Sequence, residues 1–355
     1  MDATDEVMNR RAMLRRGAVW GLATALPLHA CAAAPPIAAS SGGTRIARWK
    51  DDCTATFLLM FDDSYASHWQ VAAPELVKRS MIATFYINPG KGEYKQAASH
   101  WETELWRQGM VYADHTMTHQ GFADLEGAER EIGDCADIIR RTVPGPRRRL
   151  LSFGRPGLPP GRWNISPEEF AALLLRHDLI DRPTFDKHGA VYHLQTAEQM
   201  LALADRAVAA QGMEYLIIHG VERIGPNVKW QDFWALKQDV FLPLLDGLQQ
   251  RQAQRQLWVT DHISQHQYET ERDSAELSAR VAEDGSLRIE LTCQADPLLY
   301  SLPLTLLTLL TDIPRSWQAA RVTQGDRDVR MVITDRVIRY DAVPGGGPIV
   351  IRPLR

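Results

Sequence analysis

The chain has 355 residues, of which 45% are hydrophobic and 24% are charged. A chain of this length and composition can bury a sizeable core and has room for more than one domain. Its net charge of −4 gives no sign of a basic face, so we expect neither nucleic acid nor an anionic membrane as a partner.

The first forty residues have the character of an export signal. Asn9-Arg-Arg-Ala-Met-Leu-Arg15 resembles a twin-arginine export motif, and the apolar stretch 17–30 behind it is too short to span a bilayer. Leu28-His-Ala-Cys31 loosely matches a lipoprotein box, so a lipid anchor at Cys31 and ordinary cleavage both stay open. We predict a signal and linker over 1–40 and an exported protein, periplasmic or secreted, with no transmembrane span after signal removal.

Three cysteines follow this leader: Cys53, Cys135 and Cys293. None of them forms a C-x-x-C pair, which argues against a thiolate metal site. Their odd number allows one disulfide but does not require it. We expect them to be small, buried, apolar side chains.

The stretch 54–64, Thr-Ala-Thr-Phe-Leu-Leu-Met-Phe-Asp-Asp-Ser, is the strand around which the chain is organised. Its apolar and β-branched residues predict a buried parallel strand that ends at Asp62 and Asp63. Because open α/β sheets and barrels bind their ligands at the carboxyl ends of strands, both acids are expected at a functional edge. Two adjacent carboxylates repel each other, and a metal ion nearby would allow both to stay ionised.

From residue 49 onward, strand-like apolar runs alternate with helical patterns. The alternation predicts parallel strands with right-handed crossovers, and seven or eight such units indicate a closed, irregular barrel. The further predicted strands are 81–87, 110–113, 150–153, 190–193, 214–219 and 256–260. The predicted helices are 71–80, 101–108, 126–142, 167–177, 197–211 and 230–252, with Ser166 as an N-cap.

Two histidine pairs have the i, i+4 spacing that places both imidazoles on one face of a helical turn. His115 and His119 follow the strand 110–113, and His262 and His266 follow the strand 256–260. Either pair could clamp one divalent ion, but ordinary core or surface histidines also reach this spacing by chance. For the second pair, a loop that leaves the barrel is the favoured interpretation.

The character of the chain changes after residue 277. Short β-rich runs separated by Asp, Gly and Pro predict an antiparallel sandwich of about 80 residues. These runs are 278–292, 303–310, 319–323, 329–333, 337–340 and 349–351. We assign the barrel to 45–268 and the sandwich to 270–355, and we favour a packing role for the sandwich over carbohydrate binding.

Four motifs occur in a set order within 50–265. A strand ending in Phe61-Asp-Asp63 is followed by His115-x-x-x-His119, by Phe153-Gly-Arg-Pro-Gly157 and by Tyr215-Leu-Ile-Ile-His-Gly220. With these motifs the chain resembles the polysaccharide deacetylase family, which shares the NodB homology domain and is related to carbohydrate esterase family 4. The resemblance implies an α/β fold: an irregular parallel (β/α) barrel of about seven strands, here followed by the small C-terminal β-sandwich.

The resemblance also implies a metal site. Asp63, His115 and His119 would be the ligands of one divalent ion, which leaves a coordination position for water, as catalytic sites require. Imidazole and carboxylate ligands suit zinc best among the metals considered, and cobalt or nickel would also bind.

The same resemblance assigns the acid and base. Asp62 would be the general base that takes the proton from the water, and His219 the general acid that protonates the leaving atom. Arg155 would hold Asp62 ionised through a charge-assisted pair. An amide such as that of Gly157 would stabilise the oxyanion.

The chain departs from the family pattern at three places. Ser64 stands where the family has glycine, and a positive φ there would cost serine what glycine adopts freely. The motif 155–161, Arg-Pro-Gly-Leu-Pro-Pro-Gly, lacks the usual aromatic residue, which puts the sugar platform and the oxyanion amide in question. Asp181 is a candidate for the aspartate that supports the catalytic histidine. Among the aromatics, Trp163, Trp230 and Trp234 suit sugar stacking, although packing is the favoured interpretation for each.

These features predict a metal-dependent hydrolase that removes N-acetyl groups from a polysaccharide or oligosaccharide. The same machinery would serve an O-acetyl esterase, because both reactions attack an acetyl carbonyl. A glycan-binding protein without activity is a third hypothesis, and a two-metal phosphoryl hydrolase is a weaker one, since it needs more bridging carboxylates. The expected partner is the acetylated glycan, and nothing in the sequence indicates a protein partner.

Overall fold

The structure is a computed structural model that describes residues 43–183, 189–190, 193–300 and 306–354. The leader predicted over 1–40, with its twin-arginine motif and Cys31, lies outside the described residues. So do residues 191–192 of one predicted strand and 303–305 of the tail. Within the described part of the chain, no helix is both long and apolar enough to cross a membrane.

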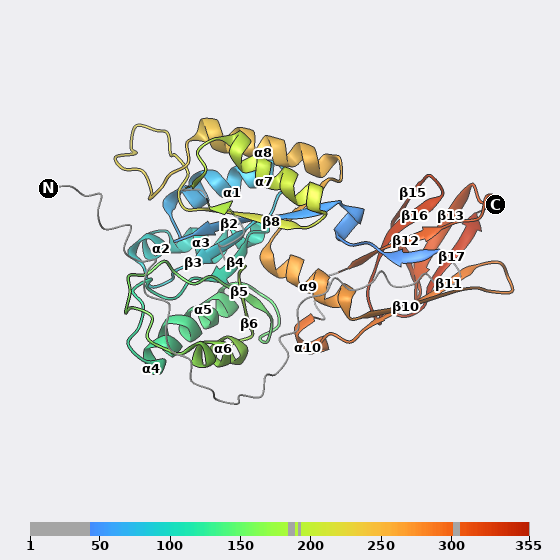
Figure 1. Cartoon of the computed structure of the whole chain (residues 1–355), viewed down its shortest axis with the longest axis horizontal. Helices are drawn as coiled ribbons and strands as arrows, with labels where there is room; N and C mark the ends of the chain where they lie inside the picture. Colours follow the sequence, from blue (N-terminus) through green and yellow to red (C-terminus); the bar gives the residue numbers. More distant parts are fainter. Residues whose placement is uncertain (1–42, 184–188, 191–192, 301–305, 355) are drawn as a thin grey trace, which may run out of the picture. The chain divides into compact units, whose positions relative to one another are not determined.

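Eight parallel strands form one curled sheet (Figure 1). They are β2 (Ala55–Asp62), β3 (Thr84–Ile87), β4 (Val111–Asp114), β5 (Leu151–Phe153), β6 (Leu179–Asp181), β7 (Gly189–Ala190), β8 (Met213–Ile218) and β9 (Leu257–Thr260). The order is β6-β5-β4-β3-β2-β8-β7, and β9 pairs with the first half of β2. The strand that leads to the two acids, β2, is therefore an inner strand, paired with β3, β8 and β9.

The predicted parallel α/β fold is confirmed. In the described residues the sheet is open rather than closed, with β6 and β7 at its two edges. The edge strand β6 is short, with three residues. Strands of this length offer few backbone groups for further pairing.

Helices connect the strands. They are α1 (Ala73–Lys78), α2 (Gly92–Gln96), α3 (Ala98–Thr103), α4 (Leu125–Ala128), α5 (Asp134–Thr142), α6 (Pro167–Arg176), α7 (Ala197–Ala210) and α8 (Gln238–Ala253). α6 and α7 begin at capping boxes formed by Ser166 with Glu169 and by Thr196 with Gln199, which confirms Ser166 as a cap. α7 and α8 pack side by side (Figure 1).

The helix predicted over 230–252 is shorter than expected. α8 begins at Gln238, and residues 219–236 form a loop. The two ends of this loop pair with each other, because Leu236 donates its amide hydrogen to Gly220 at 2.9 Å and Glu222 donates to Leu236 at 2.8 Å. Backbone groups that a helix would use internally are thus engaged across the loop.

Both faces of β2 are buried. Phe57, Leu59 and Phe61 belong to the large core that includes residues of the helices, whereas Leu58 and Met60 pack on the opposite face. A strand covered on both sides needs apolar residues without alternation, and that continuous run made it recognisable in the sequence.

Helix α9 (His262–Asp273) follows β9 directly, so the loop predicted there is wrong. Asp261 caps the helix by accepting the amide hydrogen of Ser264 at 2.9 Å. The histidines on it have separate partners: His262 Nδ1 lies 2.7 Å from Ser152 Oγ, and His266 Nε2 lies 3.0 Å from a tyrosine hydroxyl. Neither belongs to the group of possible metal ligands found among the described residues.

The tail forms two antiparallel sheets, as the sequence predicts. One has the order β1-β12-β16-β15 and the other β10-β11-β17-β13-β14. Apolar residues from both sheets share one core, among them Ile289, Leu309, Ile338 and Ile351. The strands are β1 (Thr44–Ile46), β10 (Ala275–Val281), β11 (Leu287–Cys293), β12 (Leu307–Asp312), β13 (Ala319–Gln324), β14 (Arg327–Val329), β15 (Met331–Thr334), β16 (Val337–Ala342) and β17 (Ile349–Leu354). Sequence reasoning missed β1, which pairs with β12 across more than 250 residues of chain.

The cysteines behave largely as predicted. Cys53 and Cys135 are buried, Cys293 is half-buried, and all three are free thiols. No disulfide is therefore formed among the described cysteines.

Replacing His262 should weaken the acid sensitivity of the fold. Burial lowers the pKa of His262 to about 3, so the unfolded chain binds this proton at a higher pH than the folded protein does. Stability contributed by the neutral ring is therefore lost as the pH falls from about 6.5 towards 3. In His262→Gln, the loss of unfolding free energy between about pH 6.5 and 5 should be smaller by about 2 kcal/mol, measured by urea unfolding.

Ser152→Ala is the matched control, because it removes the hydrogen bond to His262 and keeps the ring. It should lower the unfolding free energy by about 1 kcal/mol at every pH in this range. If His262→Gln keeps the wild-type pH dependence, the neutral His262 is not the source of the acid sensitivity.

Candidate functional site

Five strand ends meet at one edge of the sheet. β2 ends at Asp62, and the chain continues into Asp63. The residues that directly follow β3, β4, β5 and β8 lie at the same edge, because all these strands are parallel. Of these residues, His115 follows β4 and His219 follows β8. The order of the strands thus gathers residues that are far apart in the sequence.

The turn after β2 keeps the positive φ that the family glycine would adopt. Asp63 has φ 83° and Ser64 has φ 59°. The serine side chain compensates, because its hydroxyl accepts the amide hydrogen of Asn88 at 2.9 Å. Asn88 in turn donates from its side chain to the carbonyls of His115 (2.5 Å) and Thr116 (2.9 Å). Ser64 therefore ties the ends of three strands together.

Asp63, His115 and His119 form the group of side chains suited to a metal. Their ligand atoms all lie within 4.8 Å of one another. Asp63 Oδ1 is 3.4 Å from His119 Nε2 and 3.9 Å from His115 Nε2. Two ligands bound to one tetrahedral zinc ion at about 2.0–2.1 Å would be about 3.3 Å apart. The three residues therefore fit a divalent ion with only small movements.

The helical turn expected at this histidine pair is wrong. Residues 115–120 form a loop after β4, in which Thr116 has φ 66° and His119 has φ 60°. Within the loop His119 donates its amide hydrogen to the Thr116 hydroxyl at 3.2 Å, and both imidazole rings face Asp63.

His115 is oriented for metal binding by a neighbouring backbone. Its Nδ1 donates to the carbonyl of Gly154 at 2.6 Å, which leaves Nε2 to face Asp63. Burial lowers the pKa of His115 to about 4, although the two nearby aspartates oppose the shift. A neutral imidazole with its other nitrogen hydrogen-bonded is the state that ligates metals.

Asp62 has a different partner. Arg182, which follows β6, donates from Nη1 to Asp62 Oδ1 at 2.7 Å, and both side chains are buried. Burial alone would raise the pKa of the Asp62 carboxyl, but the charge and hydrogen bond of Arg182 hold it well below its usual range. The second oxygen, Oδ2, faces His115 Nε2 at 3.7 Å. Asp62 is thus ionised and keeps one oxygen directed at the metal group.

The predicted pair between Arg155 and Asp62 is corrected by the structure. Arg155 is exposed, and its guanidinium lies 4.4 Å from the centre of the Trp163 ring. The inward position belongs to Gly154, where a Cβ would come within 2.7 Å of the Tyr86 ring and 3.0 Å of Arg182 Cζ. Arg155, the next residue, faces outwards onto the Trp163 ring.

Sequence reasoning therefore missed Arg182, the arginine that pairs with Asp62. Its neighbour Asp181 was singled out for a different role, as support for the catalytic histidine. A usable signal was the arginine placed directly after the apolar residues Leu179 and Ile180, at the point where a strand ends.

His219 faces the same centre from β8. Its Nε2 lies 4.0 Å from Asp63 Oδ2, and 15% of its side chain is exposed. Its carbonyl accepts a hydrogen bond from the buried His68 ring at 2.5 Å. Its Nδ1 is buried without a hydrogen-bond partner in the described part of the chain, so Asp181 does not support it there.

Lys91 is a second feature that sequence reasoning missed. Its Nζ lies 3.4 Å from Asp63 Oδ1 and 5.2 Å from the centre of the Tyr65 ring. Burial would raise the pKa of Asp63, but His115 and Lys91 lower it. A cation therefore already lies beside the carboxylate that would bind a metal.

The remaining predicted positions lie further out. Gly157 is exposed, and its part in an oxyanion site stays a prediction. Trp163 packs against Phe122 with ring centres 4.5 Å apart, as the packing interpretation expects. Trp230 and Trp234 lie on the loop between β8 and α8 and are exposed.

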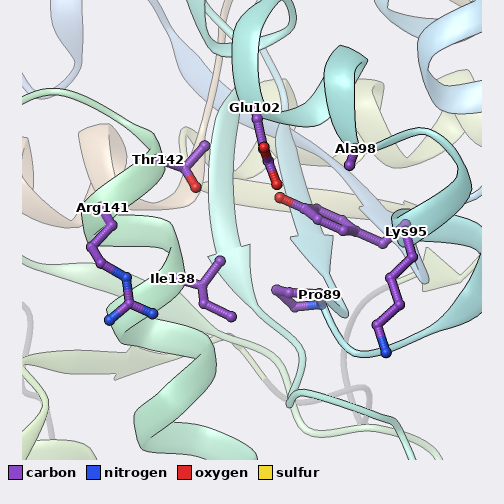
Figure 2. A pocket seen from close by; sticks show the side chains of 8 residues that line it. Pro89, Lys95, Ala98, Glu102, Ile138, Arg141 and Thr142 are labelled. Carbon is purple, nitrogen blue, oxygen red and sulfur yellow. The ribbon is translucent and has the colours of Figure 1, made fainter.

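A separate pocket of about 340 Å³ lies between α2, α3 and α5. Figure 2 shows Arg141 and Thr142 on one side of it and Lys95 and Glu102 on the other. It contains none of the predicted site residues, so the candidate chemistry lies elsewhere, at the strand ends. Its lining residues are Pro89, Tyr94, Lys95, Ala98, Glu102, Ile138, Arg141 and Thr142.

Comparison with known proteins gives distant relatives. No family model matches the chain. A gellan lyase of a Bacillus species is 23% identical over 353 residues, which cover 88% of this chain but only 13% of that protein's length.

Among solved structures, similar chains carry the names of family 4 carbohydrate esterases. One from Streptomyces lividans, in complex with acetate, is 16% identical and aligns with 58% of this chain and 92% of its own, at a TM-score of 0.41. A peptidoglycan deacetylase from Bacillus subtilis is 16% identical, with 59% and 87% covered and a TM-score of 0.37. A pseudoenzyme of the same family from Bacillus anthracis is 10% identical, with 59% and 64% covered and a TM-score of 0.41.

Replacing Arg182 should be far more costly than replacing Arg155. Arg182→Met leaves the buried Asp62 charge without its partner, and we expect it to lower the unfolding free energy by about 3–5 kcal/mol. Arg155→Met, the matched control, removes an exposed guanidinium and should cost less than about 0.5 kcal/mol. Urea unfolding of both variants at pH 7 measures the difference.

Arg182→Lys is a milder variant for the case in which Arg182→Met does not fold. A lysine retains the charge but loses the planar, forked geometry, so an intermediate loss is expected. Equal losses for Arg155→Met and Arg182→Met would contradict the assignment of Arg182 as the partner of Asp62.

Proposed function

We propose that the protein is a metal-dependent hydrolase that removes N-acetyl groups from a polysaccharide or oligosaccharide. The observation that carries the proposal is that the two adjacent aspartates have different partners. Asp63 is grouped with two histidines, whereas Asp62 is neutralised separately by Arg182 and keeps one oxygen directed at that group. A protein that only binds glycans does not need an ionised carboxylate held beside a metal group.

The ligand set fits a resident divalent ion, with zinc favoured and cobalt or nickel as alternatives. Asp63, His115 and His119 would hold it. When bound, such an ion supplies Lewis acidity, which makes water more acidic and polarises an acetyl carbonyl.

Asp62 acts as the general base. Arg182 keeps its carboxyl ionised at neutral pH, and Oδ2 is the oxygen free to accept a proton from water near His115. Arg182 is buried, and its amide also donates to Phe153 at 2.8 Å, so the carboxylate is held in one orientation. Water that attacks the acetyl carbonyl gives up its proton at this oxygen.

His219 acts as the general acid. Its Nε2 faces Oδ2 of Asp63, whereas His119 faces the other oxygen, Oδ1. The proton carried on Nε2 passes to the sugar nitrogen as the bond to the acetyl carbon breaks, and acetate and the free amine leave. With an ester substrate the same proton passes to the sugar oxygen, so an O-acetyl esterase uses identical groups.

A glycan-binding protein without hydrolytic activity is the second candidate, and Lys91 is the observation that favours it. Its ammonium lies 3.4 Å from Asp63 Oδ1, where it competes for the carboxylate with any bound cation. For the deacetylase, Lys91 must turn away from Asp63 when the metal binds. For the binding protein, Lys91 stays in place.

Location and domain roles extend the proposal. The leader over 1–40 supports export, either to the periplasm or out of the cell, where acetylated glycans are found, and a lipid anchor at Cys31 remains an alternative to release. We assign the chemistry to 45–268 and a bracing role to 270–355.

Acetate release tests the proposal. Metal-stripped protein with zinc or cobalt added back should release acetate from at least one of a panel of N-acetylated and O-acetylated glycans. Asp62→Asn and Asp63→Ala should each lower kcat/KM by more than about 100-fold, because each removes a group needed in the transition state. Asp246→Asn is the control: this aspartate is exposed on α8, and its variant should match the wild type.

The substrates that respond separate the amide from the ester reaction. Release that needs no metal, or that survives in Asp62→Asn, would contradict the mechanism. Glycan binding without acetate release from any substrate of the panel would favour the binding protein.

A further inference from the structure

The loop 219–236 concentrates exposed apolar side chains next to His219. Ile224 is 75% exposed, Trp230 82%, Phe233 51% and Trp234 49%. These four belong to the twelve large, exposed hydrophobic residues in the described part of the chain. A third of that set therefore lies in this one loop, which begins at the candidate acid, His219. Apolar surface gathered in this way marks a place where a ligand or partner binds.

The loop is held by its own hydrogen bonds and by the turn after β2. Gly220 donates its amide hydrogen to Phe233 at 3.0 Å. The carboxylate of Asp232 accepts the amide hydrogen of Ser67 at 2.8 Å and pairs with Arg223 at 3.1 Å. Ser67 also accepts the amide hydrogen of Val221 at 2.9 Å. The aromatic residues that follow Asp232 are thereby positioned relative to β2 and β8.

Gly220 allows the two arms of the loop to approach closely. A Cβ at this position would come within 2.8 Å of Asp232 Cβ and 3.0 Å of the Phe233 carbonyl oxygen. Trp234 has φ 44°, a conformation that non-glycine residues adopt at some energetic cost. The position of the Phe233 and Trp234 rings thus depends on a glycine at 220 and on a strained backbone at Trp234.

Phe233 and Trp234 form a pair that we call the aromatic step. Their ring centres are 4.3 Å apart and their planes differ by 27°, so the rings stack. The ring of His219 lies edge-on to both, 5.3 Å from Trp234 at 90° and 5.7 Å from Phe233 at 82°. The step therefore borders the ring of His219, the candidate general acid.

The chemistry of this position selects a sugar ring as the occupant. A pyranose has two flat faces lined with C–H groups, and these faces pack on aromatic rings while the hydroxyls at its edge stay in water. A half-exposed phenylalanine and tryptophan provide such a surface without a charged neighbour in the step itself. The leaving atom of the acetyl group is attached to a sugar, so the ring that carries it, or the next one along the chain, lies at this distance.

We propose that Phe233 and Trp234 form a subsite that binds the apolar face of a pyranose ring of the substrate glycan. The subsite rests on the proposed deacetylase function and adds a substrate class to it: chains of several sugars are preferred over an isolated acetylated unit. Binding energy gained at the step holds the acetyl group at the metal group and the acid. The step sets specificity and leaves the chemistry to the residues at the strand ends.

Variants of the step test the subsite by binding and by kinetics. Binding is measured by calorimetry on Asp62→Asn protein with chitopentaose, acetylated xylopentaose and cellopentaose. In that background, Phe233→Ala and Trp234→Ala should each raise the Kd of the pentasaccharide that Asp62→Asn protein binds tightest by about tenfold, the effect of losing one stacked ring (about 1–1.5 kcal/mol). Trp234→Phe, which keeps a ring, should retain most of the affinity.

Kinetics on the active enzyme give the second readout. The ratio of kcat/KM for a pentasaccharide to kcat/KM for the matching acetylated monosaccharide should fall about tenfold in Phe233→Ala and Trp234→Ala, through KM rather than kcat. Leu175→Ala is the matched control, since Leu175 is 81% exposed on α6 and away from the loop. It should leave both the Kd and the ratio unchanged.

The outcomes separate the subsite from the function. Pentasaccharide binding that weakens in the step variants, in a protein that releases no acetate, would support the subsite and overturn the deacetylase. Acetate release by the wild type, with the ratio and the Kd unchanged in the step variants, would support the deacetylase and overturn the subsite. A loss of binding in Trp230→Ala alone, or no binding of any pentasaccharide by Asp62→Asn protein, would overturn the subsite. Self-association that the step variants abolish would identify a second copy of the chain as the occupant instead.

Discussion

Two ionised carboxylates side by side at the end of a buried strand are the constraint on which the site depends. Asp62 and Asp63 repel each other, and burial makes both charges more costly. The structure resolves this by giving each carboxylate a different set of neighbours. Arg182 binds one oxygen of Asp62, whereas Asp63 faces two histidines and Lys91. The two acids are thereby fitted to different tasks, one as a base and one as a ligand.

The sheet places the two aspartates beside the other residues of the site. Parallel strands deliver residues from distant parts of the chain to one edge, and small polar contacts then join the strand ends. Ser64 and Asn88 connect the ends of β2, β3 and β4, and the carbonyl of Gly154 orients His115 from β5. Ser67, three residues after Ser64, binds Asp232 and Val221 of the loop that carries the aromatic step. The metal group, the acid and the step are therefore parts of one connected framework.

The sequence predicts correctly the features that depend on hydrophobic pattern and motif order. It does not predict which way individual side chains point. The buried strand and its two acids were evident because β2 is covered on both faces. Motif order brought out His115, His119 and His219, which the structure gathers at one edge. The assignment of Arg155 to Asp62 rests on the resemblance, and the order of motifs does not show which residue points inwards. Gly154 takes the inward place, and Arg182, which follows β6, binds Asp62. Residues 230–236, predicted as the start of a helix, belong to the loop 219–236, because the backbone pairing that holds this loop joins residues distant in sequence.

Zinc-edge anomalous diffraction from crystals grown with zinc tests the central claim most directly, because it locates the ion and the two aspartates in one experiment. We expect a single strong peak about 2.0–2.2 Å from a carboxylate oxygen of Asp63 and from Nε2 of His115 and of His119. Arg182 should remain bound to Asp62, and Lys91 should have moved away from Asp63. A peak at His262 and His266, or an ion that binds Asp62 in place of Arg182, would contradict the separation of the two acids into base and ligand.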